Sequence, residues 1–266
     1  MVYWSGDYNR CLAQNKLTSV SSPITQTEAV RQSLIQLGGV ATLGALYRTA
    51  PQVEGSSWSG TKTPFASIRR IVQTSDLFWC VRPGTWALKS EEERLRAQLQ
   101  LPFDNAPIAK IDKFNHSYYQ GLLLEWGLFE GRQTSVPAQD KNRLFLNVPL
   151  HELATFTTPP TFTFPHLMKY ASTIDVGWYN ERGFPRAFFE VEHSTDISNS
   201  LGKFMEFQDF TTKFVIVADS LRRKEWEAKM NRTAFAPLKD RVQFLSYKSL
   251  ADSHANAAQK SSLQSF

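Results

Sequence analysis

Three carboxylates near the middle of the chain, Asp175, Glu190 and Glu192, have the type and spacing of ligands for a divalent cation. Carboxylates that crowd together repel one another, and their burial is costly unless a cation compensates their charge. A hard ion such as Mg2+ prefers oxygen ligands, and it combines one or two carboxylates with waters and a substrate phosphate. Acids on alternate positions also suit the solvated face of an amphipathic strand, so the spacing alone leaves both interpretations open.

Two predicted strands and a turn must position these acids. Residues 173–180 (TIDVGWYN) alternate so that Asp175 lies opposite an apolar face. That apolar face is predicted to consist of Ile174, Val176 and Trp178. Residues 187–192 (AFFEVE) alternate in the same way, with both glutamates on the face opposite Ala187, Phe189 and Val191. The Gly-Phe-Pro turn at residues 183–185 could fold the strands into a hairpin that brings Asp175 beside Glu190.

This arrangement resembles the active site of the PD-(D/E)XK nucleases, in which an acid is followed, after a gap, by acid-x-Lys on the next strand. The phrase FEVEHSTDISNSLGKF also resembles restriction-endonuclease-like proteins of that superfamily, and the resemblance covers about residues 115–247. It implies a Mg2+-dependent nuclease in which Asp175 and Glu190 bind the metal and Glu192 completes the catalytic set. Two residues depart from the pattern, because Ile174 replaces the frequent Pro and Glu192 replaces the usual Lys. Glu occurs at that place in a minority of type II restriction endonucleases, and it changes how the attacking water would be activated.

Two further residues could support this site. Lys203, on the helix expected after the second strand, could supply the positive charge that Glu192 lacks, although helix lysines are commonly solvated. Nucleases of this superfamily have a helix before the hairpin that sometimes lends a glutamine or carboxylate, for which Gln120 and Glu125 are the candidates here. The alternative is that they are ordinary surface residues of a helix, and it suits Glu125 better than Gln120. His193 follows the acids directly, but alternation turns it away from Glu192 and favours a structural role.

The amino-terminal third predicts three helices and a hairpin. The helices are expected at residues 27–37, 42–49 and 64–75, with Thr63 as the cap of the third and Pro64 at its first position. Two short strands are expected around the Pro-Gly turn at residues 83–84. This order resembles a winged helix-turn-helix, and the phrases TPxxxI and GTWAL resemble the HARE-type winged helix in particular.

Residues 24–90 contain seven basic and three acidic residues, which suits an anionic partner. The resemblance implies that the third helix enters the major groove of double-stranded DNA, where arginine contacts guanine edges and phosphates. The candidate DNA-binding residues are Lys62, Ser67, Arg69, Arg70, Gln73 and Arg82. A winged helix that binds another protein is the alternative. Loop tryptophans such as Trp58 could contact a methylated base, but burying one methyl-sized group contributes only about 0.8 kcal/mol, so shape exclusion would have to add discrimination.

The predicted fold class is α/β (α+β), with an N-terminal winged helix-turn-helix followed by a nuclease core of mixed sheet flanked by helices. Residues 1–90 form the arm and winged helix, 91–113 a linker, 114–250 the nuclease domain and 251–266 a flexible tail. Within the nuclease domain we expect a helix near residues 115–127, a strand at 143–148 and a short helix within 160–172. A helix starting at Ser194 or Thr195, a buried strand at 213–219, a basic helix at 221–232 and a last strand at 242–247 would complete it.

Composition excludes several other classes. The chain has 266 residues, 42% of them hydrophobic, which is enough for a packed core. Its net charge of +5 is compatible with binding to nucleic acid. Its two cysteines have no metal-ligand spacing and no disulfide framework, so a reducing cytoplasm is expected. A signal peptide and a membrane span are not expected, because the sequence lacks the apolar runs that they need. The segment GSSWSGTKT departs from a phosphate-binding P-loop in the order of its last residues.

The favoured function is a Mg2+-dependent endodeoxyribonuclease of restriction type that cuts double-stranded DNA, with the winged helix reading sequence or base modification. A nuclease fold that has lost activity and regulates by binding DNA is the first alternative, since Glu192 replaces Lys. A nuclease that acts on RNA or on DNA repair intermediates is the second. A chain with one active site that cuts both strands often works as a dimer, so a homodimer is a further expectation.

Overall fold

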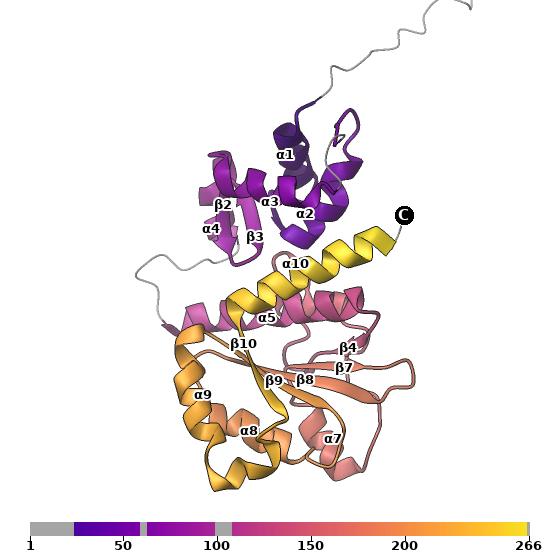
Figure 1. Cartoon of the computed structure of the whole chain (residues 1–266), viewed down its shortest axis with the longest axis vertical. Helices are drawn as coiled ribbons and strands as arrows, with labels where there is room; N and C mark the ends of the chain where they lie inside the picture. Colours follow the sequence, from indigo (N-terminus) through magenta and orange to yellow (C-terminus); the bar gives the residue numbers. More distant parts are fainter. Residues whose placement is uncertain (1–23, 59–62, 99–107, 265–266) are drawn as a thin grey trace, which may run out of the picture.

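A mixed sheet forms the centre of the larger part of the chain in the computed structural model, which describes residues 24–58, 63–98 and 108–264 (Figure 1). Its strand order is β10-β9-β8-β7-β4. The bounds are β4 Gln133–Ser135, β7 Val176–Tyr179, β8 Pro185–Glu192, β9 Lys213–Ala218 and β10 Val242–Ser246. β8 runs parallel to β9 and β9 parallel to β10, whereas β7 is antiparallel to both β8 and β4. The predicted mixed sheet is therefore confirmed.

Helices cover both faces of this sheet (Figure 1). The long helix α5 (Ile108–Phe129) and α10 (Tyr247–Gln264) pack on one face, where their apolar side chains share a core with Val176, Phe189 and Val191. α7 (Pro165–Ala171), α8 (Ile197–Met205) and α9 (Arg223–Met230) lie on the other face and share a core with Phe188 and Phe214. Because the strands are buried on both sides, β9 is almost continuously apolar, as its sequence predicts.

The central hairpin has the predicted alternation with one exception. Val176 pairs with Phe189 and Trp178 with Ala187, and these side chains share one core, whereas Phe188 lies in the other. The turn uses Gly183 at φ 77°, a conformation that glycine adopts at little cost. Ile174 was expected on the face of Val176, but it packs in the opposite core because regular pairing begins only at Val176.

Two other local predictions for this region are wrong. Residues 143–148 form a short hairpin, β5 (Leu144–Phe145) and β6 (Val148–Pro149), and no single strand, because Leu146 adopts a positive φ of 54° and reverses the chain. The short helix α6 (Leu150–Leu153) follows. α8 begins after Asp196, whose carboxylate accepts a hydrogen bond from Ser198 N at 2.9 Å, and not at Ser194 or Thr195. Aspartate caps helices as well as serine or threonine does, so Asp196 can take the role that the sequence also allowed for Ser194 or Thr195.

The amino-terminal part has its own core. α1 (Gln26–Gln36), α2 (Leu43–Thr49) and α3 (Phe65–Thr74) pack with the antiparallel sheet β1-β3-β2, whose strands are Val40–Thr42, Thr85–Leu88 and Phe78–Arg82. The three predicted helices and the predicted hairpin are confirmed. The cap of α3 is Pro64 and no side-chain hydrogen bond caps it, so the capping role predicted for Thr63 is wrong. The apolar stripe Phe65, Ile68 and Val72 is buried, as its spacing predicts.

Residues 251–264 of the predicted flexible tail (251–266) instead form the greater part of α10, which lies between the amino-terminal part and α5 (Figure 1). Residues 265–266 lie outside the described residues. Ala251, Ala255 and Ala258 are buried at helical spacing. Their small size allows close approach, because a Cβ built on Gly44 of α2 would lie only 2.8 Å from the Cβ of Ala258. Packing on both sides therefore orders a segment whose composition suggested a loose end.

The predicted linker at residues 91–113 contains α4 (Glu92–Gln98) and the first residues of α5. Leu95 of α4 is buried in a small core with Val40, Val81 and Ala87, so this helix belongs with the amino-terminal part. Residues 99–107 lie outside the described residues. The division into two domains at this segment stays a prediction.

Candidate active site

The structure brings the three predicted carboxylates together at the carboxyl end of β8. Asp175 directly precedes β7, and continuation of the β7–β8 register places it opposite Glu190. Its Oδ2 accepts a hydrogen bond from Val191 N at 2.7 Å, which ties the two strands at this point. The exposed fractions of Asp175, Glu190 and Glu192 are only 8%, 3% and 4%. The alternative of a solvated acidic strand face is therefore wrong, because all three carboxylates are buried.

These acids line a pocket of about 330 Å³ between the end of β8, α5 and the first turns of α8. Polar groups from α5, from the loop before β5 and from the loop that joins β8 to α8 also line it. The side chains that line it besides the acids include His116, Arg143, His193, Thr195, Asn199, Ser200 and Lys203. A pocket with converging carboxylates and cations is suited to a phosphate ester and its metal.

Glu190 is the most deeply placed acid of the pocket. Its Oε2 accepts a hydrogen bond from Lys203 Nζ at 2.7 Å and also lies 3.0 Å from Ser200 Oγ, whereas its buried Oε1 has no hydrogen-bond partner among the described residues. Burial and the charge of Asp175 raise the pKa of Glu190 well above its usual range, although Lys203 and Ser200 oppose this shift. A cation at the free oxygen would favour the ionised carboxylate.

Glu192 is held by hydroxyl groups. Ser200 and Thr195 each donate a hydrogen bond to one of its carboxylate oxygens, and Arg222 lies 3.9 Å from Oε2. Burial raises the pKa of Glu192, and the hydroxyl contacts and Arg222 oppose the shift. His193 is turned to Tyr247, whose hydroxyl group contacts Nδ1, as expected from its place on the other side of the strand. Its ring also borders the pocket.

Gln120 lies directly behind the acids. Its amide nitrogen donates to Asp140 Oδ2 at 2.9 Å and to the main-chain oxygen of Asp175 at 3.1 Å, and its side chain is completely buried. The structure thus places this predicted supporting residue beside Asp175. Glu125, the other candidate on α5, points elsewhere and pairs with His254 of α10 at 2.7 Å.

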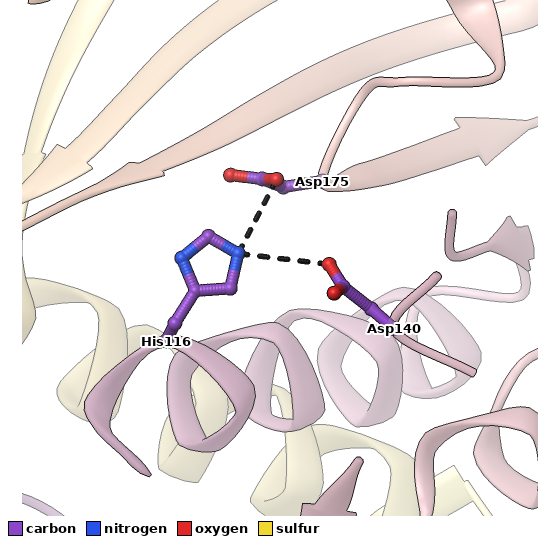
Figure 2. A group of neighbouring side chains, drawn as sticks. All are labelled: His116, Asp140 and Asp175. Atoms are coloured by element: carbon purple, nitrogen blue, oxygen red, sulfur yellow. Dashed lines mark ion pairs between the residues drawn. The ribbon is translucent and has the colours of Figure 1, made fainter. Parts of the chain in front are cut away.

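Two side chains at this place, His116 and Asp140, were missed by the sequence reasoning (Figure 2). His116 Nε2 lies 3.3 Å from Asp175 Oδ1 and 3.8 Å from Asp140 Oδ2. Burial opposes the charge of His116, but its contact with Asp175 and the charges of Asp175 and Asp140 outweigh burial, so its pKa is raised. His116 stands four residues before Gln120 on α5, and this helical spacing was the one signal that could have associated it with the site.

The model of one protein family, described as the type II restriction enzyme NmeDI C-terminal domain, matches residues 100–266, more than half of the chain. This chain belongs to that family. Family membership indicates a restriction-type nuclease that acts on DNA, and the match includes every residue that lines the pocket. No curated protein and no solved structure matches the chain. Among the described residues, no helix has the length and apolar character needed to cross a membrane.

The part of the chain before the NmeDI-type domain carries the predicted DNA-binding residues. Arg70 and Gln73 are exposed on α3, and Ser67 is half-buried beside Arg70 in a polar hollow that Gln26 and Thr27 of α1 also line. Lys62 lies outside the described residues. Ser67, Arg70 and Gln73 recur at intervals of three residues, so they follow one side of the helix away from its apolar stripe.

The other two predicted DNA-binding residues face the NmeDI-type domain. Arg69 forms an ion pair with Asp252 of α10, although both side chains keep about 40% exposure. Arg82, at the end of β2, is half-buried close to Tyr118 and Tyr119 of α5, and its burial lowers the pKa of the guanidinium. Both arginines therefore contribute to the contact between the two parts of the chain.

Proposed function

We propose that this protein is a Mg2+-dependent endodeoxyribonuclease of restriction type with a PD-(D/E)XK active site, which hydrolyses phosphodiester bonds of double-stranded DNA. Family membership supports restriction-type nuclease activity, and the pocket of the NmeDI-type domain supports the catalytic assignment. Asp175 and Glu190 hold the metal, and Glu192 completes the catalytic set. Since each chain contributes one such set, a homodimer would cut both strands in one encounter.

The observation that carries the metal assignment is the state of Glu190. A glutamate that is 97% buried keeps one oxygen without a hydrogen-bond partner in the described structure, next to the carboxylate of Asp175. An unpartnered buried carboxylate oxygen is costly, and a hard cation would satisfy it and offset the repulsion from Asp175. When bound, Mg2+ would polarise the scissile phosphate and lower the pKa of a bound water.

The neighbouring side chains have separate tasks. Lys203 fixes Glu190 through its 2.7 Å contact and places a positive charge in the pocket, where PD-(D/E)XK nucleases usually have one at the position of Glu192. Glu192 is immobilised by Ser200 and Thr195, so it can accept a hydrogen bond from the attacking water in a fixed direction. Gln120 holds the main chain at Asp175 and keeps that carboxylate in register with β8.

We further propose that the amino-terminal part is a winged helix that reads the sequence or a modified base of the DNA. Three helices followed by a hairpin, with an exposed polar side on α3, support this assignment. Ser67, Arg70 and Gln73 would contact the groove, with Lys62 as a further candidate. Arg69 and Arg82 are weaker candidates, because their present contacts are with α10 and α5.

Cleavage of supercoiled plasmid by the full-length protein with Mg2+ tests the proposal, using unmodified and methylated DNA side by side. Asp175→Ala and Glu190→Ala should abolish cutting, yet they should still bind DNA in Ca2+. Asp209→Ala is the matched control, because this exposed carboxylate of the same domain should be dispensable. Near wild-type cutting by either pocket variant would show that the metal assignment is wrong. Equal cutting of both DNAs would rule out dependence on methylation.

One observation favours a second candidate, a DNA-binding regulator without nuclease activity. Both oxygens of Glu192 are occupied by hydroxyl groups, and the lysine usual at this place is absent. Tight DNA binding by the wild-type protein, without cleavage of either DNA at any Mg2+ concentration, would support the regulator.

A further inference from the structure

His116, Asp140 and Asp175 form a three-membered cluster on the α5 side of the pocket (Figure 2). His116 comes from α5, Asp140 from the loop after β4, and Asp175 from the residue before β7. One possible ligand atom from each residue lies within 4.8 Å of the other two. The 3.8 Å between His116 Nε2 and Asp140 Oδ2 exceeds hydrogen-bond range, so these two side chains form an ion pair without a direct hydrogen bond.

The spacing matches what a bound cation requires. Ligand atoms that lie about 2.1 Å from one ion are about 3.0 Å apart at a right angle and about 3.4 Å apart at the tetrahedral angle. His116 Nε2 lies 3.3 Å from Asp175 Oδ1 and 3.8 Å from Asp140 Oδ2. The third pair, between Asp140 and Asp175, lies within 4.8 Å. A closure of about 1–2 Å, which side-chain rotation supplies, would therefore complete three ligand positions.

Neighbouring groups hold the two aspartates in this arrangement. Arg143, which is partly exposed, forms an ion pair with Asp140, with Nε 3.1 Å from Oδ1. Gln120, which is buried, donates its amide nitrogen to Asp140 Oδ2. Val191 N holds Asp175 through the oxygen that faces away from His116. Metal-binding side chains are characteristically oriented by hydrogen bonds of this kind.

Gln120 provides a second, independent sign of a missing ligand. Its side chain is completely buried, yet Oε1 has no hydrogen-bond partner among the described residues. Oε1 and Nε2 belong to one amide group, and Nε2 contacts Asp140 of the cluster. Buried amide oxygens are nearly always satisfied, so a cation or a water is expected to satisfy Oε1.

We infer that His116, Asp140 and Asp175 form a second cation site, distinct from the Asp175–Glu190 site and selective for a transition-metal ion over Mg2+. An imidazole nitrogen with two carboxylate oxygens suits transition metals, whereas Mg2+ prefers oxygen ligands throughout. The inference rests on the proposed function only because both sites would share Asp175. It assigns a binding role to His116 and Asp140.

Binding of Mn2+ to the full-length protein tests this site. Wild-type protein should bind two Mn2+ per chain in a titration followed by electron paramagnetic resonance. One of them should show coupling to an imidazole nitrogen and should resist displacement by excess Mg2+. His116→Ala should remove that coupling and weaken one site at least about tenfold, since even the loss of a supporting partner costs about 10- to 100-fold. Asp140→Asn, a nearly isosteric change, should weaken the same site.

The controls separate this inference from the proposed function. His166→Ala replaces an exposed histidine of the same domain and should leave both Mn2+ ions and the nitrogen coupling unchanged. Glu190→Gln should remove the other ion and leave the nitrogen-coupled one. Wild-type protein without nitrogen coupling, or a His116→Ala variant that binds Mn2+ as the wild type does, would refute the second site even if Glu190→Gln loses an ion and stops cutting. The opposite combination is also informative. If His116→Ala loses the nitrogen-coupled ion, the second site stands. If Glu190→Gln nevertheless cuts DNA fully with Mg2+, the catalytic assignment of Glu190 is wrong.

Discussion

Replacement of Lys203 by Met should destabilise the metal-free protein through Glu190. Methionine keeps the length and apolar stem of lysine but removes the ammonium group that lies 2.7 Å from Glu190 Oε2 and 3.0 Å from the main-chain oxygen of Thr173. The glutamate is 97% buried, so water can replace the lost partner only in part. The variant therefore leaves an acid that must either stay charged without compensation or take up a proton.

The size of this effect follows from the geometry. At 2.7 Å and an effective dielectric constant of about 20, two unit charges attract by about 6 kcal/mol, much of which offsets the cost of their burial. Removing one partner of a buried pair costs about 3–5 kcal/mol, and the 28% exposure of the Lys203 side chain reduces this to about 2–3 kcal/mol. A protein of this size loses about 2–4 °C per kcal/mol, so the melting temperature should fall by about 4–12 °C.

The deficit should depend on pH. Burial and Asp175 raise the pKa of Glu190, so its contribution to stability is complete below the ordinary glutamate pKa and is lost as the pH rises through the raised value. Lys203 lowers that pKa and limits the loss. The difference between Lys203→Met and wild type should therefore be small near pH 5 and largest near pH 8.

Thermal unfolding with a chelator, at both pH values, measures the deficit. Lys229→Met is the matched control, because Lys229 pairs with Asp196 at a similar distance of 2.8 Å while that carboxylate is 52% exposed. Exposed pairs contribute about 1 kcal/mol or less, so this control should lose little stability. Equal losses in the two variants, or a Lys203→Met deficit that is the same at both pH values, would refute the reasoning.

Three further predictions concern DNA contacts, catalysis and packing. Arg70→Ala should weaken DNA binding and reduce the magnitude of the slope of log affinity against log salt concentration by about 0.9, the value for one phosphate contact. If the variant has the same slope as the wild type, Arg70 does not contact a phosphate. Glu192→Gln keeps the shape of the side chain but removes its charge. One of the two hydroxyl groups of Ser200 and Thr195 can still donate to the amide oxygen, and the other must turn to accept from the amide nitrogen. The cleavage rate should fall by about 10²–10⁴ while DNA binding in Ca2+ persists, and an unchanged rate would exclude a base role. Gly44→Val should overpack the contact between α2 and Ala258 of α10 and lower the free energy of unfolding, measured in urea, by about 1–3 kcal/mol. Proteases should then cleave α10 earlier than in the wild type. Unchanged stability would show that the two helices can move apart without cost.

The acids and their hairpin were predictable because their signals are local. Alternation along residues 187–192 fixes which side chains share a face, and the glycine turn fixes which residues oppose each other. Asp175 and Glu190 therefore meet as predicted. Ile174 was assigned to the wrong face because the sequence does not show where strand pairing begins.

His116 and Asp140 could not be placed from the sequence in the same way. Asp140 lies in a loop whose position depends on how the β5–β6 hairpin packs against α5, and no local pattern encodes that contact. The prediction of a flexible tail in place of α10 was wrong for a related reason. The Ser/Gln/Ala composition of α10 suggests a frayed end, and only the two surfaces that bury Ala251 and Ala255 make it a helix of the core. The contacts of Arg69 with α10 and of Arg82 with α5 likewise depend on how the amino-terminal part packs against these two helices.

The position of α10 has a consequence for synthesis on the ribosome. Ala255 belongs to the core of the amino-terminal part, and Leu250 and Ala251 belong to the core around α5, so neither core is complete until residues 247–264 have emerged. A chain whose translation stops before Tyr247 lacks the helix that joins its amino-terminal part to the domain that contains the pocket. Such a fragment would expose apolar surface and attract proteases, which would spare the producing cell an incompletely assembled nuclease.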